Sequence, residues 1–163
     1  MCIRDRNRRY RECLVEGEIT IHSTDARNTL PTEARILATC HQIRKEAISI
    51  YYQENLFLFC IDEHDAGNYI EWCRSAERRV MCKHTFDLSN TSTNWSNLEK
   101  WMLAWWFGKA KMPGGHYADG SGTRTIEGNV AAHLFQVLET LSDSGLSWET
   151  AQLVCGTCGR RLV

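Results

Sequence analysis

The chain has 163 residues, of which 43% are hydrophobic and 24% are charged. These values are ordinary for a globular protein, and the length is sufficient for one buried core. The formal net charge of −1 favours neither nucleic acid nor a membrane surface as a partner, and the apolar runs are too short to span a bilayer.

The first half of the chain predicts two strands separated by one long helix. Residues 1–14 are expected to be a disordered or artefactual N-terminus, and Glu18–His22 alternates polar and apolar residues as a strand does. Over residues 31–55, apolar side chains recur at steps of three and four, which predicts one continuous helix with Cys40 on its buried stripe. Residues 56–61 are a continuous apolar, aromatic-rich run that is typical of an interior strand.

A short helix and another strand follow, and with the preceding strand they predict a parallel βαβ unit. Asp62 or Asp65 is expected to cap a helix that turns Tyr69 and Cys73 inward. Apolar and polar residues alternate over 82–88, which predicts a half-buried strand. Strand, helix and strand at this spacing are typical of two parallel strands joined by a crossover.

The second half of the chain predicts three helices and a glycine-rich loop. Ser96 and Glu99 form a capping box, which indicates the start of a helix that ends where the loop over 108–128 begins. Asn129 and Ser147 are expected to cap the last two helices.

These elements predict an α/β fold with a small, mostly parallel sheet flanked by helices. A single domain is expected over residues 15–155, followed by a flexible C-terminal tail over 156–163. In the helix after Asn129, Val137 and Leu138 are both expected to face the core.

Residues 37–47 read Leu-Ala-Thr-Cys-His-Gln-Ile-Arg-Lys-Glu-Ala, and residues 50–57 read Ile-Tyr-Tyr-Gln-Glu-Asn-Leu-Phe. This spacing resembles the pattern T-C-R-Q-I-R-x-E-A-x-x-x-Y-Y-x-x-N-x-F of uncharacterised fungal F-box-like or F-box-associated domain proteins. The resemblance implies an α/β scaffold and supplies no catalytic residues. The opening F-box segment of that family is not recognisable upstream of Pro31. A fragment of a ubiquitin-ligase substrate adaptor is therefore an alternative interpretation.

The chain has eight cysteines, which could form disulfides or stay reduced. Cys60 and Cys73 fall on apolar faces of predicted elements, where a free thiol behaves as a small hydrophobic group. No secretory signal is recognisable. We therefore expect reduced thiols and an intracellular location, cytoplasmic or nuclear.

Cys155 and Cys158 form the sharpest local motif, a C-x-x-C that can supply half of a tetrahedral zinc site. Cys82 and His84 would complete the site only if the fold brought them alongside. Incidental cysteines in a tail are the favoured interpretation, and a zinc-stabilised module is the alternative. No other cofactor is expected, because the glycine-rich loop lacks the Gly-Lys-Ser/Thr of a phosphate-binding loop.

Six tryptophans are the remaining feature of the composition. Trp101 and Trp105 fit a core face, whereas Trp95, Trp106 and Phe107 are candidates for an exposed contact with a protein partner. Nucleic acid is not expected, because few basic residues interleave with these rings. The leading hypothesis is a non-catalytic protein–protein interaction or scaffold module.

Overall fold

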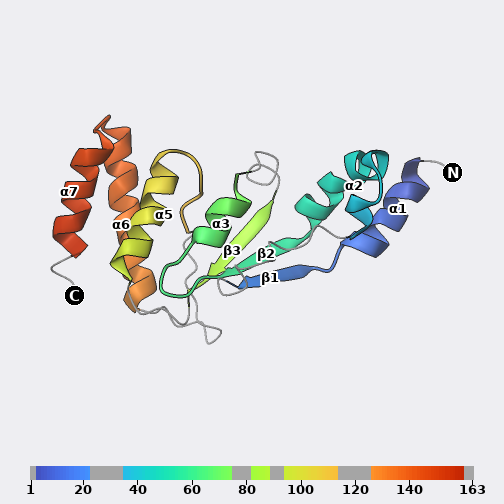
Figure 1. Ribbon diagram of the computed structural model, residues 1–163, viewed down its shortest axis with the longest axis horizontal. Helices are drawn as coiled ribbons and strands as arrows, with labels where there is room; N and C mark the ends of the chain where they lie inside the picture. Colours follow the sequence, from blue (N-terminus) through green and yellow to red (C-terminus); the bar gives the residue numbers. More distant parts are fainter. Residues whose placement is uncertain (1–2, 23–34, 75–81, 89–93, 114–125, 160–163) are drawn as a thin grey trace.

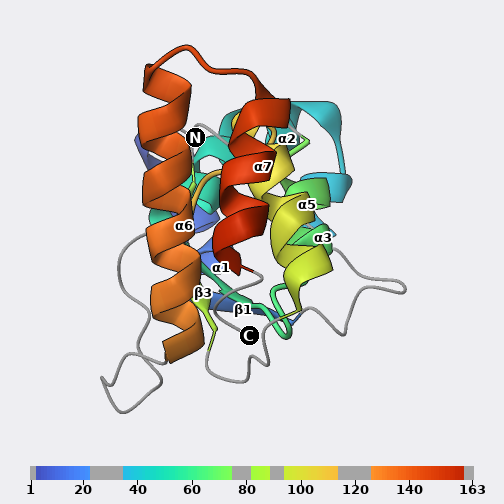
Figure 2. The same cartoon turned by 90° about the vertical axis from the view of Figure 1, so that its left-hand side faces the viewer.

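The computed structural model describes one α/β domain in which helices flank a small parallel sheet (Figure 1). The two N-terminal helices lie at one end, the sheet in the middle, and three C-terminal helices at the other end (Figures 1 and 2). The structure describes residues 3–22, 35–74, 82–88, 94–113 and 126–159.

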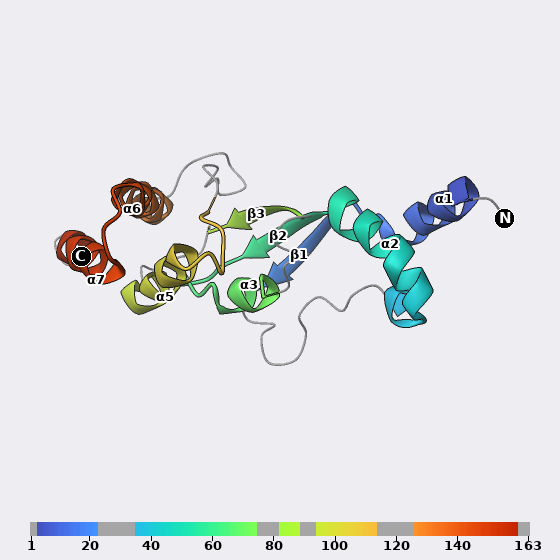
Figure 3. The ribbon, with the colours of Figure 1, turned by 90° about the horizontal axis from the view of Figure 1, so that it is seen from above.

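The sheet consists of β1 (Glu18–His22), β2 (Leu56–Cys60) and β3 (Lys83–Asp87), in that spatial order. Both neighbouring pairs are parallel, as predicted for the βαβ unit. The apolar run of β2 occupies the central position, where Phe57 and Phe59 are buried. The helix α3 (Gly67–Trp72) covers one face of the sheet (Figure 3).

Residues 3–14, which belong to the segment expected to be disordered or artefactual, form the helix α1 (Ile3–Leu14). The helix packs on α2 (His41–Glu54), and its last residue, Leu14, is fully buried. Two ion pairs connect the helices: Arg6 to Glu46 at 3.2 Å and Arg11 to Glu54 at 2.8 Å.

The side chain of Asn55 joins the ends of α1 and α2 to the start of β1. Its amide nitrogen donates to the carbonyl oxygens of Leu14 (2.7 Å) and Tyr51 (2.9 Å). Its amide oxygen accepts from the backbone nitrogens of Glu16 (2.8 Å) and Gly17 (3.2 Å). Because Asn55 is fully buried, all four bonds replace solvation that the folded chain has lost.

The predicted continuous helix is wrong, because the chain breaks between a 3₁₀ turn, η2 (Arg35–Ala38), and α2. Cys40 is the N-cap of α2, with an extended backbone (φ −155°), and its sulfur accepts from the nitrogen of Ile43 at 3.4 Å. Cys40 is therefore exposed and not part of the buried stripe. The expected start at Pro31 lies outside the described residues.

Capping differs from expectation at α3 and at α5 (Trp95–Trp106). Ala66 is the N-cap of α3, although Asp65 still accepts a bond from the nitrogen of Gly67 at 3.0 Å. At α5 the N-cap is Asn94, whose side chain accepts from the nitrogen of Asn97, so the capping box beginning at Ser96 is wrong.

Two C-terminal helices, α6 (Ile126–Asp143) and α7 (Trp148–Gly159), pack against each other and against α5 (Figure 2). The helix α6 begins before the expected cap at Asn129, and its Val137 is exposed where an inward position was expected. Ser147 caps α7 as predicted, accepting from the nitrogen of Thr150 at 3.5 Å. The helix α7 extends to Gly159, into the stretch expected to be a tail.

Aromatic side chains connect the sheet to the C-terminal helices. Trp101 of α5 is fully buried, and its ring centroid lies 5.2 Å from that of Phe86 in β3 and 5.5 Å from that of Phe135 in α6. On the sheet side, Trp72 packs against Phe57 and Phe59 with centroid distances of 5.3 and 5.1 Å. The core therefore continues from the sheet into the helical end.

Candidate functional site

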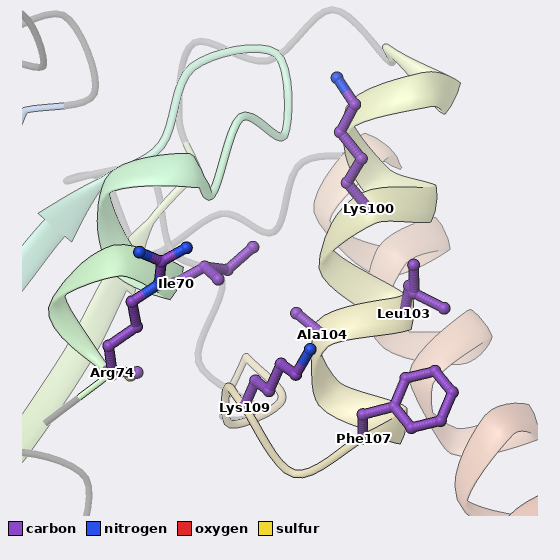
Figure 4. Close-up of a pocket in the computed structure, with 8 residues that line it drawn as sticks. Ile70, Arg74, Lys100, Leu103, Ala104, Phe107 and Lys109 are labelled. Atoms are coloured by element: carbon purple, nitrogen blue, oxygen red, sulfur yellow. The ribbon is translucent and has the colours of Figure 1, made fainter. Parts of the chain in front are cut away.

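A pocket of about 500 Å³ lies between α3 and α5 (Figure 4). This volume falls within the range of small-ligand and side-chain binding pockets. Its described lining combines apolar groups with three cationic side chains: Ile70, Cys73, Arg74, Lys100, Leu103, Ala104, Phe107 and Lys109.

The apolar part of the lining follows from the helical period of α5. Leu98, Trp101 and Met102 form its buried face, and Ala104 lies at the edge of that face toward α3. Leu103 and Phe107 are four residues apart and share the neighbouring, outer face of the helix. Their exposed fractions are 37% and 59%, which are high for large apolar side chains.

The charged part of the lining comes from α5 and from the turns that follow α3 and α5. Figure 4 shows Arg74 on the α3 side, and Lys100 and Lys109 on the α5 side. Glu71 forms an ion pair with Arg74 at 2.9 Å, but no carboxylate lines the pocket among the described residues. The pocket is therefore locally positive although the chain as a whole is nearly neutral.

The turn that ends α5 determines where Phe107 and Lys109 lie. Gly108 adopts φ +65°, and its nitrogen donates to the oxygen of Trp105 at 2.8 Å. The nitrogen of Lys109 donates to the oxygen of Ala104, also at 2.8 Å. This pair of bonds defines a Schellman motif, which turns the chain back toward the helix and holds Lys109 beside the pocket.

The three predicted partner-binding residues do not form one patch. Trp95 and Trp106 lie at opposite ends of α5, roughly 16 Å apart along the helix axis. Trp106 is half-buried, and its ring packs against Trp148 of α7 with a centroid distance of 5.7 Å. Of the three, Phe107 lines the pocket. The glycine-rich loop expected beside them lies largely outside the described residues.

Sequence reasoning missed most of the pocket. Arg74 and Lys100 are far apart in the chain and belong to no motif, so only the packing of α3 on α5 brings them together. Leu103 carried a usable signal, because it falls off the buried stripe of an otherwise apolar helix.

The C-x-x-C motif lies on α7. Cys155 is buried against the core, and the side chain of Cys158 lies outside the described residues. Across the described ranges, no group of three or more His, Cys, Asp or Glu side chains could hold a metal ion, so Cys82 and His84 are not joined to Cys155 in such a group. The zinc-stabilised module stays a prediction.

Tyr69 of α3, which is buried, and His84 of β3, which is half-buried, form a polar pair. The hydroxyl of Tyr69 accepts from the backbone nitrogen of Lys111 at 3.0 Å and lies 3.1 Å from Nε2 of His84. Burial, with a smaller effect of the Lys111 charge, lowers the pKa of His84 to about 4, and burial also raises the pKa of Tyr69. His84 is therefore neutral at neutral pH, and its ring nitrogen shares a part-buried hydrogen bond with the hydroxyl of Tyr69.

None of the described helices combines the length and apolar character needed to cross a membrane. Comparison with family models, curated proteins and solved structures finds no match for this chain. The resemblance to fungal F-box-like proteins accordingly stays a prediction based on the sequence pattern.

Proposed function

We propose that the protein is a non-catalytic interaction module that binds a protein partner through the outer face of α5. We call Leu103, Phe107 and the adjoining pocket the α5 face. The observation that carries the proposal is the exposure of Phe107 (59%) and Leu103 (37%) beside a pocket of about 500 Å³. Large apolar side chains at the edge of a pocket are typical of the central contacts of protein interfaces.

The chemistry of the lining favours binding over catalysis. Its described residues include no carboxylate and no imidazole, which are the groups that most often act as general acid or base. Cys73 is fully buried within the wall, where it behaves as a small apolar group and is not accessible as a nucleophile.

We place this module in the cytoplasm or the nucleus. Cys73, Cys82 and Cys155 form no disulfide and are buried in the core. Cysteines that form no disulfide are typical of those compartments, which keep thiols reduced.

Affinity capture with matched variants tests the proposed function. Tagged wild-type protein, a Leu103→Ala/Phe107→Ala variant and a Leu153→Ala control would be incubated with extract of the source organism. Leu153 is 72% exposed on α7, so the control removes an even more exposed apolar side chain elsewhere.

We expect proteins captured by the wild type and the control to be lost with the double variant, while circular dichroism shows all three folded. Retention of every captured protein by the Leu103→Ala/Phe107→Ala variant would contradict the assignment of the α5 face.

A further inference from the structure

We infer that the occupant of the pocket is an acidic segment of the partner, with one large apolar side chain between flanking carboxylates. This inference rests on the proposed function and specifies the chemistry of the partner. Figure 4 places the features that carry it, an apolar gap between α3 and α5 and cationic side chains around that gap.

The apolar gap selects the central side chain of the segment. Ile70 points from α3 toward α5, and Ala104 faces it from α5 (Figure 4). Because Ala104 has a short side chain, it leaves room that an aliphatic or aromatic group of the partner can fill. Leu103 and Phe107 extend this apolar surface outward along α5. Burying one such side chain gives the contact its hydrophobic contribution.

The cations select the flanking residues. Lys100 lies one helical turn before Ala104, roughly 6 Å along the axis, whereas Lys109 reaches toward Ala104 from the turn after α5 (Figure 4), with its ammonium 6.0 Å from the centroid of the Phe107 ring. An extended segment rises about 3.3 Å per residue, so a carboxylate that reaches each lysine lies about two residues before or after the apolar residue. Arg74 is partly neutralised by Glu71, so the two lysines are the main contributors to the positive charge.

Charge complementarity separates this occupant from the other candidates. A basic segment would be repelled by the lysines and would find no carboxylate among the described lining residues. A nucleic acid would need a longer track of cations and exposed rings for stacking. An acidic segment with an apolar centre is complementary to both parts of the pocket.

Peptide titration monitored by NMR tests the inference. The probes are Ser-Asp-Ala-Phe-Ala-Glu-Ser, its lysine counterpart Ser-Lys-Ala-Phe-Ala-Lys-Ser, and Ser-Asp-Ala-Gly-Ala-Glu-Ser, which lacks the apolar side chain. We expect the first peptide to shift the backbone amides around Ile70 and Ala104, and to bind at least about fivefold more tightly than either of the others.

Charge reversal gives the decisive comparison. We expect a Lys100→Glu/Lys109→Glu variant to bind the acidic peptide roughly tenfold more weakly and to gain affinity for the lysine peptide. The control is Lys45→Glu, on α2 at the opposite end of the molecule (Figure 1), with no expected effect. Higher salt should weaken the wild-type interaction.

The outcomes distinguish this inference from the proposed function. Loss of captured partners with Leu103→Ala/Phe107→Ala but not with Lys100→Glu/Lys109→Glu would keep the α5 face and overturn the acidic segment. Equal affinity for the acidic and lysine peptides, no detectable binding of the acidic peptide, or tighter binding of a single-stranded oligonucleotide would also overturn it.

Discussion

Two polar side chains, the buried Asn55 and the half-buried His84, show how single residues constrain this fold. Asn55 satisfies four backbone groups at the junction of α1, α2 and β1. His84 stays neutral in a pair with Tyr69 that links β3 to α3. Neither residue lines the proposed binding surface, so we expect substitutions of either one to change the free energy of unfolding more than the affinity for a partner.

Replacing Asn55 by Ala should lower the free energy of unfolding by about 3 kcal/mol, because it leaves buried backbone groups without partners. Urea denaturation of wild type and variant measures this loss. The control is Asn97→Ala, which removes a single exposed side-chain bond to the oxygen of Glu63 and should cost less than about 1 kcal/mol. Equal losses in the two variants would contradict the junction role of Asn55.

The depressed pKa of His84 predicts a loss of stability in mild acid. Its pKa is about 4 in the folded protein against an ordinary value of 6.5, so the unfolded chain binds more protons between these values. The contribution of His84 is thus present above pH 6.5 and is lost as the pH falls toward 4. Urea midpoints between pH 7 and 5 should fall more steeply for the wild type than for His84→Gln; identical slopes would exclude this role.

At the level of elements, α5 carries both structural and binding surfaces. Its inner face joins the core through Trp101, and its outer face presents Leu103 and Phe107 to the partner we propose. The turn at Gly108 ends the helix beside the outer face and directs the chain back, so that Lys109 lines the pocket.

Substitution of Gly108 tests this turn. A Cβ at Gly108 would meet no atom within 4 Å, so the cost of Gly108→Ala is conformational and should be about 1 kcal/mol at φ +65°. Gly108→Asn should cost less, because asparagine tolerates the left-handed region. Thermal denaturation of the three proteins measures the difference. An alanine variant as stable as the wild type would show that the turn does not constrain the end of α5.

At the level of the whole molecule, a series of aromatic contacts connects the sheet with the C-terminal helices of this elongated fold. Trp101 touches Phe86 of the sheet and Phe135 of α6, so the sheet and the helical end share a core. The α5 face lies where these two parts meet, between α3 and α5.

Trp101→Ala should therefore destabilise the protein by roughly 3–5 kcal/mol, the usual cost of removing a fully buried large ring. Trp106→Ala, which removes a half-buried ring, provides the comparison and should cost less. Denaturation followed by far-ultraviolet circular dichroism measures both. A Trp101 variant no less stable than the Trp106 variant would contradict the bridging role.

The sequence by itself determined the three strands, because apolar periodicity is a local property of a strand. It also determined the parallel order of β2 and β3, because two strands joined by one helix at this spacing form a crossover. It also located the helical stretches of α5, α6 and α7. It failed at Cys40, because a 3₁₀ turn followed by a helix repeats apolar residues at nearly the same steps as one continuous helix.

Tertiary structure alone decided the place of α1 and the existence of the pocket. The helix α1 is stabilised by contacts with Glu46, Glu54 and Asn55, which lie about forty residues away in the chain. Likewise, Arg74 and Lys100 become neighbours of one pocket only when α3 packs on α5. Such contacts depend on how elements pack, and no local pattern of residues encodes them.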